Sequence, residues 1–204
     1  MRSLILFSSF ILLAGCNIPH GPLEKQPWVT HRCPAGQKNY SPGHQLAQQS
    51  LTKGYDFSFV ISADDWYDPN LLGKEAKDWL KAGGVSYFSY ARPNTYAKNR
   101  LSALVAFRMT AGQTYEACAY VNDANGSFRF DDIRKVPVGD TIHVQYRLVE
   151  ESAVFNLTHR GKTIISTFNN FEHANRQVSV GPWHGGSLPA PVPTSIQTRI
   201  SWIN

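Results

Sequence analysis

Short apolar stretches separated by turn residues make up the chain from residue 55 to residue 203. The clearest is 141–149, where Ile142, Val144, Tyr146 and Leu148 alternate with polar side chains. Alternation with a period of two places the apolar and polar sets on opposite faces of a strand. Comparable aromatic and β-branched stretches predict strands at 55–61, 85–90, 101–109, 115–121, 128–133, 141–149, 153–159, 163–168, 177–180 and 195–203.

One stretch has a helical pattern instead. Between residues 72 and 81, Ala76, Trp79 and Leu80 fall on one helical face, and a Gly-Gly pair follows as a stop. We therefore predict a short helical insertion near 72–81. Many short strands at close spacing, with no long amphipathic helix, indicate an all-β fold, either a two-sheet sandwich or a barrel.

The N-terminal part of the chain has a different pattern. Residues 4–13 form an apolar run behind Arg2, which is typical of a secretory signal peptide and shorter than the roughly 20 residues that span a bilayer. Five prolines between residues 17 and 48 predict an extended or irregular tether. The expected domains are a signal peptide (1–15), a Pro-rich tether (16–48) and a β-sandwich domain (49–204).

Charge narrows the classes of partner. The chain has 204 residues and a formal net charge of +5, with an isoelectric point of about 9.2. Its Lys and Arg residues are dispersed rather than grouped, so the footprint of a nucleic-acid-binding face is missing. We expect no nucleic-acid partner.

The residues that end the apolar run, Leu13-Ala14-Gly15-Cys16, resemble the lipobox of bacterial lipoproteins. The resemblance implies cleavage before Cys16, a diacylglycerol thioether on its sulfur, and a fatty acyl chain such as palmitate on the new N-terminus. Several acyl chains anchor a protein durably to a lipid bilayer, whereas a single chain is marginal. Asn17 is not the Asp that retains many enterobacterial lipoproteins at the inner membrane. The resemblance therefore implies the outer membrane, if the cell is Gram-negative.

The chain has three cysteines. If Cys16 carries lipid, Cys33 and Cys118 remain as a pair. Disulfides persist in the compartments to which exported proteins are delivered. We therefore predict a Cys33–Cys118 disulfide that pins the N-terminal extension to the domain. Two separate buried thiols are the alternative.

A second resemblance lies near the C-terminus. Pro182-Trp183-His184-Gly185-Gly186, followed by Ala190-Pro191 and a final strand, is similar to the end of many concanavalin-like, laminin-G-like jelly-roll domains of bacterial surface proteins. Residues 68–73 and 82–86 are similar to a loop and a strand start of such domains. The resemblance covers roughly residues 55–203 and implies a two-sheet antiparallel jelly roll. It implies no activity.

Aromatic residues in loops are the first candidates for binding. Trp66, Trp183 and His184 lie in loop-like contexts, where an exposed ring can stack on a sugar. Large aromatics are also highly buried on average, so packing at the ends of the sandwich explains the same residues.

A calcium site is a further candidate, because Asp64, Asp65, Asp68 and Asn70 offer several oxygen ligands within one loop. Their spacing does not match an EF-hand loop, and Asp and Asn are ordinary turn residues. We favour the turn interpretation and expect no metal and no cofactor.

Catalysis has one candidate. A glycosidase needs two carboxylates flanking the bond, and no stretch here presents them on one strand face. A polysaccharide lyase needs a base with Arg or Gln nearby, and His143, Gln145 and Arg147 share one face of the strand 141–149. The solvated outer face of an antiparallel strand has the same composition, and we favour that interpretation.

These observations predict a membrane-anchored lipoprotein that acts as a non-catalytic binding module for a glycan or another envelope component. A structural or protein-interaction lipoprotein of the envelope is the alternative. A polysaccharide lyase that uses His143, Gln145 and Arg147 is the third hypothesis.

Overall fold

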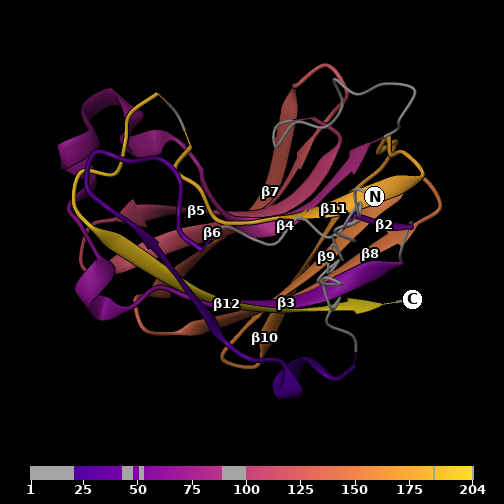
Figure 1. The fold of residues 1–204 in the computed structure, drawn as a ribbon, viewed down its shortest axis with the longest axis horizontal. Coiled ribbons are helices and arrows are strands. Elements are labelled where there is room, and N and C mark those ends of the chain that lie inside the picture. The colour runs from indigo at the N-terminus through magenta and orange to yellow at the C-terminus, as the bar shows by residue number, and fades with distance from the viewer. Residues whose placement is uncertain (1–20, 43–47, 51–52, 89–99, 186, 204) are drawn as a thin grey trace, which may run out of the picture.

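The computed structural model describes residues 21–42, 48–50, 53–88, 100–185 and 187–203. Within these ranges the chain is a two-sheet antiparallel jelly-roll sandwich (Figure 1). Its strands are β1 Val29–Cys33, β2 Gln48–Ser50, β3 Gly54–Val60, β4 Leu80–Phe88, β5 Ser102–Thr110, β6 Thr114–Asn122, β7 Phe128–Pro137, β8 Thr141–Val149, β9 Ser152–His159, β10 Lys162–Phe168, β11 Arg176–Val180 and β12 Thr194–Ile203.

Each sheet has six described strands. The first sheet has the order β1-β12-β3-β8-β9-β10, and the second has the order β2-β11-β4-β5-β6-β7. In Figure 1 the second sheet lies above the first. All ten predicted strands are confirmed, and the two additional strands, β1 and β2, precede them in the chain.

The predicted helical insertion is present, but its bounds are different. The described ranges contain three short 3-10 helices, η1 Leu23–Lys25, η2 Ala63–Asp65 and η3 Pro69–Lys77. The third corresponds to the prediction and ends before Trp79, because Leu80 already pairs with Phe107 as the first residue of β4. Lys81, predicted at the end of a helix, is therefore a strand residue.

The predicted tether at 16–48 also needs correction. Strand β1 pairs along its whole length with β12, so it is the edge strand of the first sheet. Its His31 and Cys33 are buried, as is Tyr40 farther along the chain. The sandwich therefore begins well before residue 49. Cys16 and the apolar run before it lie outside the described residues.

The main core fills the space between the sheets. On β5 and β6, the odd-numbered residues from Ala103 to Phe107 and from Ala117 to Val121 face the other sheet and belong to this core. The residues between them face away. Leu104, Ala106, Cys118 and Tyr120 form a second apolar cluster with Trp79, Val180 and Trp183 on the outer face of the second sheet. Both faces of β5 and β6 are thus covered.

The predicted Cys33–Cys118 disulfide is wrong, because both thiols are free and buried. Cys33 belongs to the core between the sheets, where its Sγ lies 3.3 Å from the Gln37 carbonyl oxygen. Cys118 belongs to the cluster on the outer face of the second sheet. A disulfide needs Cα atoms within about 7 Å and converging Cβ atoms, and here the backbone of a sheet separates the two side chains.

None of the helices in the described ranges has the length and apolar character needed to cross a membrane.

Candidate functional site

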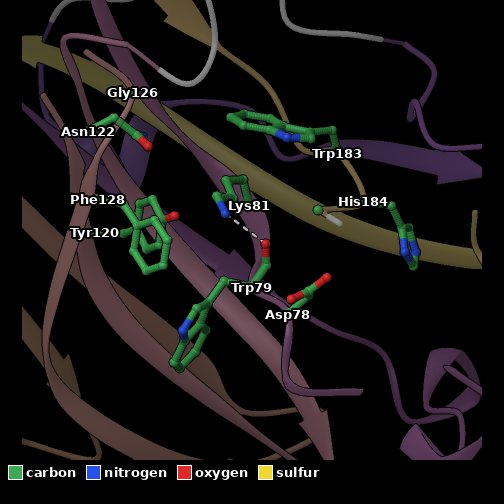
Figure 2. Close-up of a pocket in the computed structure, with 10 residues that line it drawn as sticks. Asp78, Trp79, Lys81, Tyr120, Asn122, Gly126, Phe128, Trp183 and His184 are labelled. Carbon is green, nitrogen blue, oxygen red and sulfur yellow. Dashed lines mark hydrogen bonds between the residues drawn. The ribbon is translucent and has the colours of Figure 1, made fainter. Parts of the chain in front are cut away.

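The outer face of the second sheet is hollowed at one place. A cavity of about 470 Å³ is lined by residues from the start of β4, from β6 and β7, and from the loop after β11. Figure 2 shows Lys81 in the middle of this group, with Trp183 on one side and Trp79, Tyr120 and Phe128 on the other. Asp78, Asn122, Gly126, His184 and Gly185 complete the lining. We call this the Lys81 cavity.

A β-bulge places Lys81 in the cavity. The pairing of β4 with β5 shifts register between Lys81 and Gly83. Lys81 opposes Ala106, which belongs to the outer cluster, while Ala82 is buried in the core between the sheets. At Gly84, φ is 147°, and a Cβ would lie 2.4 Å from the Ala103 carbonyl oxygen. Only glycine fits there, and at Gly83, beside the register shift, φ is 150°, so the Gly-Gly pair provides the backbone freedom that this part of β4 uses.

The Lys81 side chain is buried, with 6% of its surface exposed. Its Nζ donates a hydrogen bond to the Trp79 carbonyl oxygen at 2.7 Å and lies 4.0 Å from the centroid of the Tyr120 ring. Within the described ranges Lys81 forms no ion pair. Burial lowers the pKa of Lys81 to about 8, and the nearby Cys118 and Asp78 offset only part of that effect.

Aromatic rings line one side of the cavity. The Tyr120 and Phe128 rings stack with centroids 5.4 Å apart, Phe128 stacks on Phe130 at 6.2 Å, and Phe130 contacts Trp79 at 5.3 Å. The row forms because Phe128 and Phe130 alternate on β7 and because Phe130 pairs with Tyr120 in register. Phe128 and Phe130 remain 56% and 41% exposed. Exposed apolar side chains that lie side by side are characteristic of interaction sites, which makes this end of the row a candidate for one.

Trp183 lines the opposite side. The main chains of Trp183 and Lys81 exchange two hydrogen bonds of 3.1 Å, which fix the loop to the start of β4. Farther along this loop, the backbone amides of Ser187 and Leu188 both donate to the Glu75 carboxylate at 2.7 Å. The loop that carries Trp183 is thus held at both ends by the protein itself. The predicted binding residue Trp183 does lie at a cavity.

His184 lines the cavity mainly through its position in the loop. Its ring is turned away from Lys81 (Figure 2) and stacks on Tyr40 at 6.0 Å and on Tyr67 at 6.3 Å. Burial, aided by the charge of Lys38, lowers the pKa of His184 to about 4, so the ring is neutral at ordinary pH. Its Nε2 is buried and has no hydrogen-bond partner among the described residues. His184 therefore packs the loop rather than supplying a proton.

Trp66 is not part of the cavity. Its Nε1 donates to the Thr110 carbonyl oxygen at 2.9 Å, and its ring packs against the main core. The structure therefore separates Trp66 from the other two predicted binding residues, and packing accounts for it.

The lyase candidates lie on the other side of the molecule. His143 and Gln145 are exposed on the outer face of the first sheet, on β8. His143 Nδ1 lies 2.8 Å from Ser58 Oγ, and Arg147 pairs with Asp56 at 3.1 Å. None of the three lines the Lys81 cavity. Their face is the partly solvated outer surface of a sheet, as the favoured interpretation predicts.

The acidic loop residues have other partners. Asp65 Oδ1 accepts a hydrogen bond from the Ser195 amide at 2.8 Å, and Asp68 Oδ1 accepts one from the Asn70 amide at 2.9 Å. In the part of the chain that the structure describes, no group of three or more His, Cys, Asp or Glu residues is arranged to hold a metal ion. Asp68 and Asn70 thus make a local turn bond, as the turn interpretation expects, while Asp65 ties its loop to the start of β12.

Sequence reasoning missed four central lining residues, Trp79, Lys81, Tyr120 and Phe128, and the adjoining Phe130. One signal was present in Phe128-Arg129-Phe130, where two rings alternate in a strand with few other large apolar residues. Lys81 had no comparable signal, because its place depends on the bulge in β4.

No family model matches the sequence, and no curated protein does. Three solved structures illustrate what the fold is similar to. A prokaryotic β-1,3-1,4-glucanase (lichenase) derived from a mouse hindgut metagenome is 6% identical with a TM-score of 0.45, and the match covers 86% of this chain and 79% of that one. Alginate lyase A1-II', a member of polysaccharide lyase family 7, is 11% identical with a TM-score of 0.45 over 78% of this chain and 66% of the other.

The carbohydrate-binding module CBM66 from Bacillus subtilis is 12% identical with a TM-score of 0.40, covering 88% of this chain and 96% of that module. Identities of this size say nothing about which ligand this chain binds, since one fold carries many functions. The site must be argued from its own residues.

Proposed function

We propose that this protein is a non-catalytic glycan-binding module of the bacterial cell envelope, anchored to a membrane through Cys16. The observation that supports glycan binding is the Lys81 cavity, where aromatic rings, of which Phe128 is well exposed, border a hollow that also offers polar groups. Its volume of about 470 Å³ lies in the range of small-ligand sites, roughly 300–1,000 Å³.

The chemistry of the lining suits a sugar. A pyranose ring has an apolar face of C–H groups, which packs on aromatic rings, and an edge of hydroxyls, which needs hydrogen-bonding partners. Phe128 and Trp183 offer rings on two sides of the cavity (Figure 2), and Asp78 and Asn122 add polar side chains to its lining. A rigid wall lowers the entropic cost of binding, and the fixed Trp183 loop supplies one.

The lining does not support hydrolysis. Glycosidases use two carboxyl groups on either side of the bond, and Asp78 is the only carboxylate in the described lining. The His184 ring is turned toward Tyr40 and Tyr67. His143, Gln145 and Arg147, the lyase candidates, lie on the outer face of the other sheet.

A broad glycan array, probed with the full chain purified in detergent, tests the proposal. We expect wild-type protein to bind a subset of oligosaccharides. The Phe128→Ala/Phe130→Ala double variant should lose this binding, because the sugar ring loses its stacking partners. The fold should be kept, because both side chains are exposed and exposed side chains contribute little to stability. The matched control is Ile165→Ala, which removes a side chain that is 64% exposed on the edge strand of the other sheet. Equal binding by the double variant and wild type would contradict the proposal.

A second candidate is a structural or protein-interaction role in the envelope. One observation favours it: Phe128, Phe130 and Ile133 are exposed on β7, which is the edge strand of its sheet among the described strands. An exposed apolar edge strand is a template for pairing with another chain. If no oligosaccharide binds, and if a site-specific crosslinker at residue 130 captures one envelope protein, this second function replaces the first.

Membrane anchoring is proposed from the lipobox resemblance at Leu13-Ala14-Gly15-Cys16, with the outer membrane as the destination in a Gram-negative cell because Asn17 follows. Wild-type chain should incorporate labelled palmitate in cells, and Cys16→Ser should not. A Cys16→Ser variant that still carries the label would overturn this part of the proposal. Cys33→Ser is the matched control, since that thiol is buried in the core.

A further inference from the structure

Among the residues that the structure describes, Lys81 is a buried cation without an ion-pair partner. Its side chain is 6% exposed, and every ion pair within the described ranges involves other residues. Lysine is almost never this deeply buried unless it is paired. Burying the Lys81 charge therefore lowers the stability of the folded protein, and a methionine of similar length would not have this effect.

The hydrogen bonding of Lys81 is incomplete as well. An ammonium group has three N–H donors. In the described part of the chain, one of them is accounted for by the Trp79 carbonyl oxygen, and the Tyr120 ring lies against another side of the group. The amine borders a hollow that solvent can enter, so a ligand can reach it (Figure 2).

An anion is the ligand group that fits this arrangement. The attraction between Lys81 and a negative charge is strengthened by the apolar surroundings, because the Lys81 side chain is largely buried and the Tyr120 ring lies against its amine, which leaves little water to screen the charge. A charge-assisted hydrogen bond from an ammonium to a carboxylate or sulfate is roughly twice as strong as one between neutral groups.

Resting on the proposed glycan-binding function, we propose that the Lys81 cavity selects anionic sugars. The carboxylate or sulfate of the sugar accepts a hydrogen bond from Lys81 Nζ, and the sugar ring stacks on the aromatic wall formed by Tyr120 and Phe128. Uronates and sulfated sugars share this chemistry.

Asp78 is the one acidic group in the described lining and opposes this selection. It lies more than 4.0 Å from Lys81 Nζ, since the two form no ion pair. It is partly exposed, so solvent screens its charge. Asp78 thus weakens the preference for anions without cancelling it, and Asp78→Asn should strengthen it.

Matched ligand pairs test the inference. Titration calorimetry of the full chain in detergent compares tetragalacturonate with its methyl ester, and a sulfated galactan tetrasaccharide with its desulfated form. Wild-type protein should bind at least one anionic member roughly tenfold to a hundredfold more tightly than its neutral partner. The two pairs distinguish a carboxylate from a sulfate. In Lys81→Met the preference should disappear, so that the anionic member and its neutral partner bind with equal affinity.

The outcomes separate this inference from the function on which it rests. If neutral oligosaccharides bind and their anionic partners bind no better, the inference is overturned and the glycan-binding function stands. If Lys81→Met keeps the anionic preference, the inference is also overturned. If no saccharide of either kind binds, the glycan-binding function itself fails and takes the inference with it.

A pH series on wild-type protein gives a second readout that needs no variant. Deprotonation of Lys81 should weaken binding of the anionic sugar as the pH rises through 8 toward 10, and binding of the neutral partner should not change. The titratable groups beside Lys81 or in the cavity lining are Asp78, Cys118, Tyr120 and His184. Arg108, Glu116 and Asp131 act on Cys118 in turn. Burial raises the pKa of both Cys118 and Tyr120, and His184 titrates near 4. An unchanged preference for the anion across pH 7 to 10 would contradict the inference.

Discussion

The outer faces of the two sheets both carry polar side chains, but these side chains differ in burial and in pairing. On the first sheet, His143, Gln145 and Arg147 lie on a partly solvated surface, and Arg147 has a carboxylate partner in Asp56. On the second sheet, Lys81 is buried under aromatic rings and has no ion-pair partner within the described ranges. The first face is explained by solvation alone, while the second is not.

The comparison shows what distinguishes a site from a polar surface. Alternating polar residues on a strand cost nothing when water covers them. A buried, incompletely bonded cation lowers stability, and groups of this kind are found more often at functional sites than elsewhere. As an indication of a site, the type of polar residue matters less than whether its hydrogen bonds and charge have partners in the fold.

The largest difference between the faces should come from Trp183→Ala. Trp183 is buried, belongs to the outer cluster and holds its loop to β4. Loss of a buried Trp costs about 3–5 kcal/mol of unfolding free energy. Gln145→Ala, the matched change on the other face, should stay within about 0.5 kcal/mol. Urea unfolding measures both, and equal losses would remove the energetic contrast between the two faces.

The histidines on the two faces should also differ in how much they lower the stability of the protein in acid. The pKa of His184 is about 4 in the folded protein and about 6.5 in the unfolded chain. The unfolded chain therefore binds the proton first, and about 3 kcal/mol of stability should be lost as the pH falls from 6.5 to 4.

His184→Phe keeps the stacking on Tyr40 and Tyr67 and should remove most of this loss. On the other face, burial and the charge of Arg199 lower the pKa of the more exposed His143, and His143→Gln should leave the loss largely intact. Unfolding curves at several pH values measure the effect. A His184→Phe variant as acid-sensitive as wild type would contradict the buried, neutral state of His184.

Substitution of the buried cation should stabilise the protein. The pKa of Lys81 is about 8 when folded and about 10.4 when unfolded, so its charge opposes folding at neutral pH. We expect Lys81→Met to raise the unfolding free energy at pH 7 by about 1–3 kcal/mol. The gain should shrink as the pH rises from 8 to 10.5, where the unfolded chain also loses the proton. A destabilised Lys81→Met variant at pH 7 would show that Lys81 has a stabilising partner.

The smallest effect is expected for the paired cation on the first sheet. Arg147 and Asp56 are 3.1 Å apart and roughly a third to a quarter exposed. A partly exposed ion pair contributes about 0–1 kcal/mol, so Arg147→Met should lower the unfolding free energy slightly or leave it unchanged. A loss above 2 kcal/mol, measured by urea unfolding, would mean that this face too depends on a buried charge network.

Much of the fold was predictable from the sequence, because period-two patterns such as that of 141–149 report directly which face of a strand is buried. Strand β1 was not predictable, because it is short and lies between prolines, which are typical of irregular segments. Its partner β12 is also far away in the sequence, at the other end of the chain. The disulfide prediction failed because a cysteine count carries no information on which face of a sheet each thiol occupies.

The site was predictable in part. Trp183 was recognised from its loop context, and the structure places it at the cavity. Lys81 was not, because the helical spacing of Ala76, Trp79 and Leu80 extended the expected helix over it. Only the register shift at Gly83 brings Lys81 to the same face as Tyr120 and Phe128, and such a bulge arises from tertiary pairing rather than from local pattern.

Chemical-shift mapping tests the central claim most directly. Isotope-labelled protein is titrated with an oligosaccharide that binds in the glycan array, and the amide and aromatic signals that move are assigned. We predict that the changes gather at Trp79, Lys81, Tyr120, Phe128 and Trp183, and that those of His143, Gln145 and Arg147 stay within the noise. Changes centred on β8, with the Lys81 cavity unaffected, would place the site on the other sheet and contradict this account.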